Sequence, residues 1–240
     1  MSPAMQNAGF AALGIDCRYL ARDVTVDQLN AVIQEMRSNP SVLGANVTIP
    51  LKQAVIPLLD GLDPLAERIG AVNTIDRQQG RLNGSNTDVE GFSKALEECG
   101  YEIEGKNVAV IGAGGAARAV VAALDGRVDR LVLVARNLEQ ARGLLLDLQA
   151  QAGEALAFHR MLEAIADSAV IVNATPADLP PSEALRPGQR IFDLRSRRSA
   201  EGRSMLLHQG IASFEIWTGK KAPVETMRSA LAKAAELIAV

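Results

Sequence analysis

The segment from Asn107 to Asn137 constrains the fold of this chain more than any other. It begins with a short apolar run, Val108–Ile111, which has the length expected of a fully buried strand. Gly112, Gly114 and Ala117 follow with the spacing G-x-G-x-x-A. In a strand–helix–strand unit these positions serve a tight turn, a close approach of the backbone to a pyrophosphate, and close packing of helix on strand. The segment therefore predicts a Rossmann-type dinucleotide-binding unit, with the helix N-terminus facing the phosphates.

The residues after the second predicted strand, Leu131–Val134, indicate which dinucleotide the unit prefers. An NAD site usually has Asp or Glu at this point, because the carboxylate binds a ribose hydroxyl. This chain has Ala135, Arg136 and Asn137 instead. Since a guanidinium pairs well with a phosphate, Arg136 favours NADP over NAD. The alternative is that Arg136 is a solvated charge in a loop.

Composition narrows the class of protein. With 240 residues, 48% of them hydrophobic and 22% charged, the chain has enough material for one large or two modest globular domains. A net charge of −3 gives no sign of a nucleic-acid partner, and no apolar run is long enough to span a membrane. The widely spaced Cys17 and Cys99 are typical of a reducing compartment, so we expect a cytoplasmic protein. Only two histidines are present, and we expect no metal site.

Strands and helices alternate on both sides of Gly105, which predicts an α/β chain of two domains that meet at a cleft. Ser2 and Pro3 predict the start of a first helix, with Ser2 as its N-cap, and Thr87–Glu90 has the form of a capping box. Further strands are predicted at Cys17–Ala21, Val42–Thr48, Ala71–Ile75, Arg81–Asn83, Val170–Asn173 and Ile191–Asp193. Further helices are predicted at Val26–Met36, Pro50–Leu58, Asp63–Ile69, Leu138–Gln151 and Pro223–Ile238.

Three polar clusters lie at the ends of predicted elements in the first half of the chain. They occupy residues 46–52, 71–74 and 84–88. Ligands of α/β proteins bind at strand ends that face a cleft. These clusters are therefore the candidates for a substrate site.

Lys52 is the candidate for proton transfer in these clusters. It falls in the first turn of the helix predicted after Pro50, where the helix dipole opposes a cation and so favours an amine that can act as a general base. A neighbouring carboxylate would hold the ammonium in place, and Asp88 is the natural one. The alternatives are a solvated surface lysine and an acid in a first helical turn that stabilises its own helix. For Thr48, helix cap and ligand remain open.

Six segments then resemble the shikimate dehydrogenase family, which includes quinate and aminoshikimate relatives. They are, in order, NVTIPLK, GAVNTI, GSNTDVEGF, GAGGAARA, NATP and FEIWTGKKAPVETM, and they span nearly the whole chain. The resemblance implies an N-terminal α/β substrate-binding catalytic domain of residues 1–103, completed by a C-terminal helix in residues 214–240. Residues 104–213 would form the Rossmann-type NADP-binding domain.

The same resemblance implies the reaction and its residues. The reaction would be the reversible, NADP-dependent reduction of 3-dehydroshikimate to shikimate, in chorismate and aromatic amino-acid biosynthesis, by a monomer or homodimer. Lys52 would be the catalytic acid and base, with Asp88 as its partner at the substrate hydroxyl. Ser2 would contact the carboxylate of the substrate, and Thr48, Asn73 and Gln209 would contact its hydroxyls or carboxylate. NADP would be held by Gly112, Ala113, Gly114, Gly115, Ala116, Ala117 and Arg136, with Gly202 near the nicotinamide.

The chain also departs from the family pattern. It begins at the second serine of the usual Ser-x-Ser-Pro segment, which implies that the first strand and one serine are absent. Gln6 stands in place of a usual His, and Asp178-Leu179 in place of Gly-Met. The segment from Asp193 to Gly202 is short, with Ser196 at the position of a Tyr. Two other functions therefore stay open: a truncated or regulatory relative that binds NADP or a cyclic polyol acid without turnover, and an enzyme acting on quinate or an amino analogue.

Overall fold

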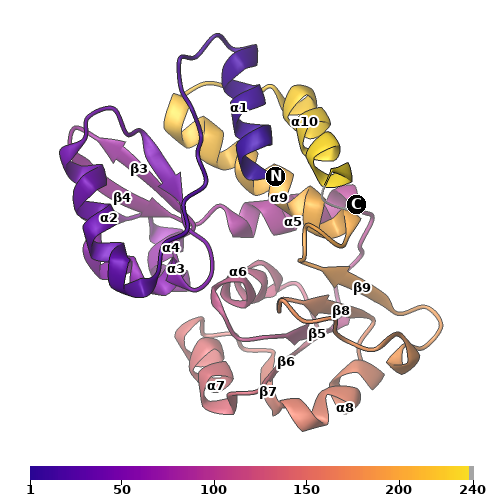
Figure 1. Ribbon diagram of the computed structural model, residues 1–240. Helices are drawn as coiled ribbons and strands as arrows, with labels where there is room; N and C mark the ends of the chain where they lie inside the picture. The colour runs from indigo at the N-terminus through magenta and orange to yellow at the C-terminus, as the bar shows by residue number, and fades with distance from the viewer. Residues whose placement is uncertain (238–240) are drawn as a thin grey trace.

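The chain is an α/β protein with two separate sheets. The computed structural model describes residues 1–237, apart from the side chain of Ser182. One sheet has five strands and the other four, and helices from both ends of the chain pack together beside them (Figure 1). The α/β class and the Rossmann-type unit expected from the sequence are confirmed.

The larger sheet is parallel throughout, in the order β7-β6-β5-β8-β9. On β5, Val108 and Val110 join the core formed with two helices, α6 and α7, whereas Ala109 and Ile111 join the core formed with α8. Because both faces are covered, the strands are apolar almost throughout. The strands are β5 (Asn107–Ile111), β6 (Arg130–Ala135), β7 (Gly153–Ala157), β8 (Val170–Asn173) and β9 (Arg190–Asp193). The helices are α6 (Gly115–Leu124), α7 (Leu138–Asp147) and α8 (Met161–Ala166).

The smaller sheet has the order β1-β3-β4-β2 and lies in the N-terminal part of the chain. Strands β3 and β4 form a hairpin that turns at Gln79 and Gly80, and β2 pairs with β4 in parallel. Helix α2 buries Leu29 and Ile33 in the same core as Ile75. The strands are β1 (Gly44–Asn46), β2 (Gly61–Leu62), β3 (Thr74–Gln78) and β4 (Arg81–Ser85). The helices are α2 (Val26–Ser38), α3 (Leu51–Ala54), a 3₁₀ turn (Ile56–Leu58) and α4 (Pro64–Ile69).

Four helices from distant parts of the sequence form a third group. Phe10 on α1 stacks on Phe214 on α9, with ring centroids 5.1 Å apart, and Met227 on α10 is fully buried in the same core. Helices α1 and α10 lie side by side next to α9 (Figure 1). The group consists of α1 (Ser2–Ala12), α5 (Asp88–Glu98), α9 (Ala200–Thr218) and α10 (Val224–Glu236). Ile238, the expected end of the last helix, lies outside the described residues.

Helix α9 packs closely along α5. A Cβ atom added at Gly91 on α5 would lie only 2.7 Å from the Cβ of Gln209 on α9, so glycine permits the close approach of the two helices. The helix runs unbroken through residues 213 and 214, where the sequence analysis placed a domain boundary. Within residues 1–237 no helix, α9 included, has both the length and the apolar character needed to cross a membrane.

Two contacts join the parallel sheet to the N-terminal part of the chain. Phe92 on α5 packs edge-on against Phe192 on β9, with ring centroids 5.0 Å apart. The buried guanidinium of Arg118 on α6 donates to the carbonyl of Ile69, the last residue of α4, and pairs with Asp147 at 2.8 Å. A shared core and a buried arginine therefore hold the two sheets at a defined separation.

Two local predictions about the N-terminal region are wrong. Ser2 is the first residue of α1 rather than its N-cap, which is Met1. Residues Cys17–Ala21 form no strand. The backbone N–H and carbonyl of Tyr19 instead bond to the side-chain amide of Asn7, at 2.7 and 3.0 Å, so an asparagine takes the place of a neighbouring strand.

Candidate active site

Two cavities meet between the sheets. The smaller, of about 530 Å³, lies among α1, α9 and the N-terminal sheet, and the larger, of about 1260 Å³, lies at the carboxyl ends of β5 and β6. Carboxyl ends of parallel strands are where open α/β sheets bind ligands. The wall common to both cavities is formed by Ile49, Lys52, Ala174, Thr175 and Pro176.

Lys52 and Asp88 form an ion pair at this common wall. Lys52 lies on the short helix α3, and Asp88 is the first residue of α5. The Lys52 Nζ is 2.5 Å from the Asp88 Oδ2, and the two side chains are only 11% and 7% exposed. The expected proximity of the two residues is observed, whereas their part in catalysis stays a prediction.

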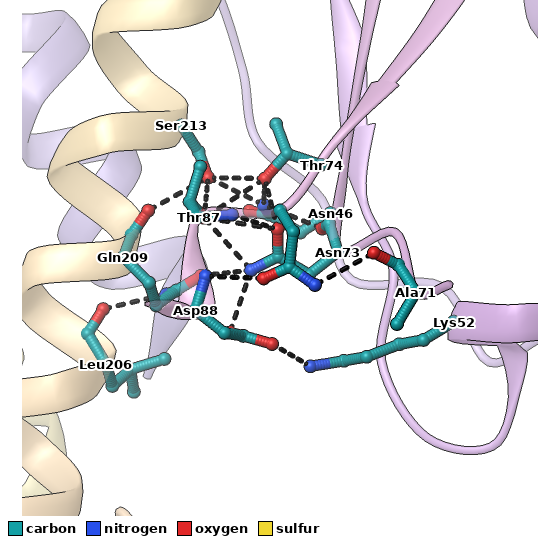
Figure 2. Close-up of polar contacts among 11 residues, drawn as sticks. Asn46, Lys52, Ala71, Asn73, Thr74, Thr87, Asp88, Leu206, Gln209 and Ser213 are labelled. Atoms are coloured by element: carbon teal, nitrogen blue, oxygen red, sulfur yellow. Dashed lines mark hydrogen bonds and ion pairs between the residues drawn. The ribbon is translucent and has the colours of Figure 1, made fainter. Parts of the chain in front are cut away.

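The Asp88 carboxylate is held from both sides. Its Oδ1 accepts a hydrogen bond of 2.8 Å from the Asn73 Nδ2, while Oδ2 faces Lys52 (Figure 2). Its backbone N–H donates to the Asn86 Oδ1 at 3.0 Å, and the Asn86 amide donates to the Ala71 carbonyl at 2.8 Å. The orientation of the carboxylate is therefore fixed before any ligand binds.

A buried network of hydroxyls and amides supports Asn73. Thr87 donates its backbone N–H to the Asn73 Oδ1 at 2.8 Å, and the hydroxyls of Thr74 and Ser213 lie 2.8 Å apart (Figure 2). The Asn46 amide donates to the Ser213 hydroxyl at 2.9 Å. All three polar clusters singled out in the sequence thus meet in one network.

The role predicted for Thr87 is wrong. Thr87 is the N-cap of α5, but its side chain makes no capping hydrogen bond. Its hydroxyl lies within hydrogen-bonding distance of Asn73, Thr74 and Ser213 instead, so this buried hydroxyl is satisfied within the network. The Thr87 hydroxyl therefore belongs to the buried polar network and does not form the predicted capping box.

Helix α9 contributes two polar side chains, those of Gln209 and Ser213, to this network, and only Gln209 was expected from the sequence. Gln209 lines the smaller cavity and accepts a long bond of 3.4 Å from the Asn73 amide. Ser213 lies one turn further along the same face, and its hydroxyl also donates to the Gln209 carbonyl at 2.9 Å. The four-residue spacing of the two polar residues in an apolar segment was the available signal.

Ser2 and Thr48 line the smaller cavity as well. Among the described residues neither hydroxyl has a hydrogen-bond partner, and the N-cap of α3 is Pro50. The Thr48 hydroxyl therefore does not cap α3, and of the two roles expected for it, helix cap and ligand, the second remains. Both hydroxyls are free to bind a polar ligand.

Gly202 also lines the smaller cavity and not the larger one. A Cβ atom there would lie 2.7 Å from the backbone N of Ser196, so its lack of a side chain lets the start of α9 pack on the preceding loop. The structure thus shows a packing function for this glycine.

The glycine-rich loop has the shape that a dinucleotide requires. Gly112 has φ 113°, a conformation that side chains disfavour, and no atom lies within 4 Å of a Cβ built at Gly114. A Cβ at Gly115 would lie 3.1 Å from the Cβ and Cδ of Lys52, so the loop touches the stem of the lysine. Ala117 is fully buried in the core, in agreement with the predicted packing of helix on strand.

The remaining loop positions divide between the two cavities. Ala113 lines the larger cavity together with Gly112, Gly114 and Gly115, whereas Ala116 lines the smaller one. The open space above Gly114 and the free amides at the start of α6 fit a pyrophosphate.

Arg136 lies where β6 ends and lines the larger cavity. It is exposed, and within residues 1–237 no carboxylate pairs with it. The neighbouring Asn137 caps α7 by accepting a 3.1 Å bond from the Gln140 backbone N–H. A phosphate bound in this cavity could therefore pair with Arg136 without displacing another anion.

A half-buried tyrosine that was not predicted from the sequence also contacts the site. Tyr19 lines the smaller cavity and donates its hydroxyl hydrogen to the Asn46 Oδ1 at 3.1 Å. Burial raises the pKa of its phenol to about 12, so it is neutral at ordinary pH. Within the described residues, no group of three or more His, Cys, Asp or Glu side chains is arranged to hold a metal ion.

Three family models match the sequence. Residues 1–75 match the shikimate dehydrogenase substrate binding domain, residues 93–185 match shikimate / quinate 5-dehydrogenase, and residues 202–232 match the shikimate 5′-dehydrogenase C-terminal domain.

Whole-chain comparisons agree with these matches. Shikimate dehydrogenase (NADP(+)) from Moorella thermoacetica is 40% identical over 98% of this chain and 89% of the relative. Shikimate 5-dehydrogenase from Listeria monocytogenes, solved in complex with shikimate and NAD, is 34% identical with a TM-score of 0.81, over 96% of this chain and 91% of that one. The enzyme from Thermus thermophilus, in complex with NADP(H) and shikimate, is 32% identical with a TM-score of 0.83, over 97% and 94%. On this likeness in sequence and structure, the chain belongs to the shikimate dehydrogenase family.

Proposed function

We propose that this protein catalyses the reversible, NADP-dependent reduction of 3-dehydroshikimate to shikimate. The observation that carries the proposal is the position of Lys52, which lies at the wall common to both cavities and is paired with Asp88 at 2.5 Å. A proton donor at that point can reach a ligand in the smaller cavity beside the site for a dinucleotide. The names of the relatives support the same reaction.

Lys52 transfers the proton in this proposal. In the direction of reduction, the Lys52 ammonium donates a proton to the carbonyl oxygen of the substrate, which becomes a hydroxyl. In the direction of oxidation, the neutral amine takes that proton back. Asp88 stabilises the ammonium and keeps Nζ directed at the substrate oxygen, because the Asp88 Oδ2 pairs with Nζ while Asn73 holds the Asp88 Oδ1. NADP supplies or accepts the hydride when it is bound.

The substrate lies in the smaller cavity, where the free groups are polar. The hydroxyls of Ser2 and Thr48 and the amides of Asn73 and Gln209 can bond to a ring that carries several hydroxyls. Asn73 is otherwise engaged with Asp88 and Thr87, so we assign it chiefly to positioning the carboxylate.

NADP binds in the larger cavity. The free backbone amides at the start of α6 hold the pyrophosphate, and Arg136 pairs with the 2′-phosphate. The Gly112 amide donates to the Val134 carbonyl at 2.8 Å, so Gly112 shapes the turn of the loop that borders the cofactor. Gly202 borders the smaller cavity, so it would meet the cofactor only where the two ligands touch.

We further propose two domains, a substrate domain of residues 1–103 with helices α9 and α10, and a dinucleotide domain of residues 104–199, so that the boundary expected at residue 213 moves to the start of α9. The close packing of α9 against α5 supports assigning α9 as a whole to the substrate side. The two unpaired cysteines, Cys17 and Cys99, are consistent with the cytoplasm.

The test is to mix the purified protein with shikimate and NADP, then with NAD, and to follow the absorbance of reduced nicotinamide. The proposal predicts turnover with a higher kcat/KM for NADP. One matching family model names quinate as well, so quinate is the comparison substrate. Saturable NADP binding without turnover of either acid would instead support a binding protein.

A further inference from the structure

We propose that Arg197 binds the carboxylate of the substrate and so selects acids over uncharged polyols. This inference rests on the proposed function, because it assigns one further group of the same ligand. Arg197 lies in the short loop between β9 and α9 and lines the smaller cavity, as do Ser2 and Thr48.

Arg197 is the one cationic side chain at the smaller cavity that has no carboxylate partner among the described residues. Four cationic side chains line it, and three of them already have a carboxylate partner in the structure. These three pairs are Arg22 with Glu35 at 2.7 Å, Lys52 with Asp88 at 2.5 Å, and Arg195 with both Asp193 at 2.5 Å and Asp178 at 2.7 Å. Within residues 1–237, Arg197 has neither an ion-pair partner nor a hydrogen bond to its guanidinium. Its guanidinium is thus free for an anionic ligand, as is the α-ammonium of Met1, which also lines the cavity.

The loop that carries Arg197 is anchored. The Arg195 guanidinium binds the Asp193 carboxylate, with the Arg195 Nε 3.0 and 2.9 Å from the two carboxylate oxygens. The Ser199 hydroxyl donates to the Asp193 carbonyl at 2.5 Å, and the Arg198 backbone N–H donates to the Arg195 carbonyl at 2.8 Å. The backbone on both sides of Arg197 is therefore fixed, which reduces the backbone entropy that the loop must lose on binding.

The chemistry of the cavity is consistent with one carboxylate on the ligand. The other free groups there are hydroxyls and amides, which suit the hydroxyls of a polyol ring but do not neutralise a charge. A guanidinium is planar and matches a carboxylate with two parallel hydrogen bonds. Lys52 is not available for this task, because Asp88 already holds its ammonium.

Three variants test the proposal: Arg197→Ala, Arg197→Lys and, as matched control, Arg198→Ala. Arg198 is the adjacent exposed arginine, but it does not line the cavity. We expect Arg197→Ala to raise the KM for shikimate by about tenfold with kcat and the KM for NADP little changed, since one charge-assisted contact is lost. Arg197→Lys should recover part of the loss, and Arg198→Ala should behave as wild type.

The methyl ester of shikimate supplies a second readout. Wild type should prefer the acid to the ester, and Arg197→Ala should lose most of that preference, which a merely structural role would leave intact. Equal KM values for shikimate in Arg197→Ala and Arg198→Ala, or an unchanged preference, would overturn the proposal.

Calorimetric binding of shikimate separates this proposal from the proposed reaction. If wild type binds shikimate without turnover, and Arg197→Ala weakens that binding about tenfold while Arg198→Ala does not, the reaction is wrong and the carboxylate site stands. If turnover occurs and Arg197→Ala leaves KM and binding unchanged, the reaction stands and the carboxylate site is wrong. If wild type neither turns over nor binds shikimate, both are overturned.

Discussion

Replacing Asp88 with asparagine is the most informative single change at the ion pair. The carboxylate makes two contacts: Oδ2 pairs with the Lys52 ammonium at 2.5 Å, and Oδ1 accepts a hydrogen bond from the Asn73 amide at 2.8 Å. An amide has the same shape but only one oxygen. In Asp88→Asn, its NH₂ group must therefore face either Lys52 or Asn73, and each of these is a donor.

The expected magnitude follows from burial. Removing one partner of a fully buried ion pair costs about 3–5 kcal/mol. Here the Lys52 side chain is 11% exposed and borders two cavities, so its ammonium can turn towards water. We therefore expect a loss of about 2 kcal/mol in the free energy of unfolding, near the value of a hydrogen bond to a charged group. We expect kcat/KM to fall by about 100-fold, because the proton donor is no longer held in position.

The assays are steady-state kinetics with shikimate and NADP, and urea unfolding. Glu90→Gln is the matched control, since Glu90 lies in the same first turn of α5 and pairs with Lys94 at 2.6 Å, with both side chains about half exposed. It removes the same charge from the helix N-terminus and should cost about 0.5 kcal/mol or less. If Asp88→Asn kept kcat/KM within about twofold of wild type, or lost no more stability than the control, the reasoning would be refuted.

Three further changes test separate parts of the structure. Arg136→Ala should raise the KM for NADP by about 10-fold or more and leave that for NAD nearly unchanged, because only NADP has the 2′-phosphate. Arg118→Ala should lower the free energy of unfolding by about 2–3 kcal/mol in urea, since it leaves the Ile69 carbonyl without its donor. Glu98→Gln should lower the free energy of unfolding at neutral pH. The reason is that the pKa of Glu98 is lowered to about 2, first by the Arg228 guanidinium and also by the neighbouring His208. A carboxyl group whose pKa is lowered by folding stabilises the folded protein above its ordinary pKa of 4.5. The difference in the free energy of unfolding between wild type and Glu98→Gln should therefore shrink as the pH falls from 4.5 towards about 2.

Each of these has a nearby control. Arg142→Ala serves the two arginine changes, because Arg142 is exposed and, within residues 1–237, its one carboxylate partner is Glu139 on its own helix. Glu97→Gln serves for Glu98, since Glu97 is exposed and adjacent. Equal weakening of NADP and NAD, a stability loss in Arg118→Ala no larger than in its control, or a pH-independent difference for Glu98→Gln would count against the respective argument.

The sequence predicted the parallel sheet and its glycine loop well, because local pattern determines both. The apolar run Val108–Ile111 is buried on both faces, and Gly112 needs its positive φ whatever the rest of the chain does. The meeting of the polar clusters could also be predicted, since Asn46, Asn73 and Asp88 all lie at element ends.

The failures come from tertiary contacts that leave no local trace. Thr87 matches a capping box in sequence, but its hydroxyl belongs to a network that includes Ser213 on α9, which lies 126 residues later in the sequence. The sequence analysis did not identify α9 itself, because this helix is buried on several sides and lacks one clear apolar face. Short elements such as β7 and α8 were missed because a few residues carry too little periodic signal.

The kcat of Lys52→Ala with saturating shikimate and NADP tests the central claim most directly, with the exposed Lys94→Ala as control. If Lys52 transfers the proton at the wall common to the two cavities, kcat should fall by about 100-fold or more while the KM for shikimate changes by less than about threefold. A kcat equal to that of wild type and of Lys94→Ala would contradict the account, because the proton would then have to pass through another group.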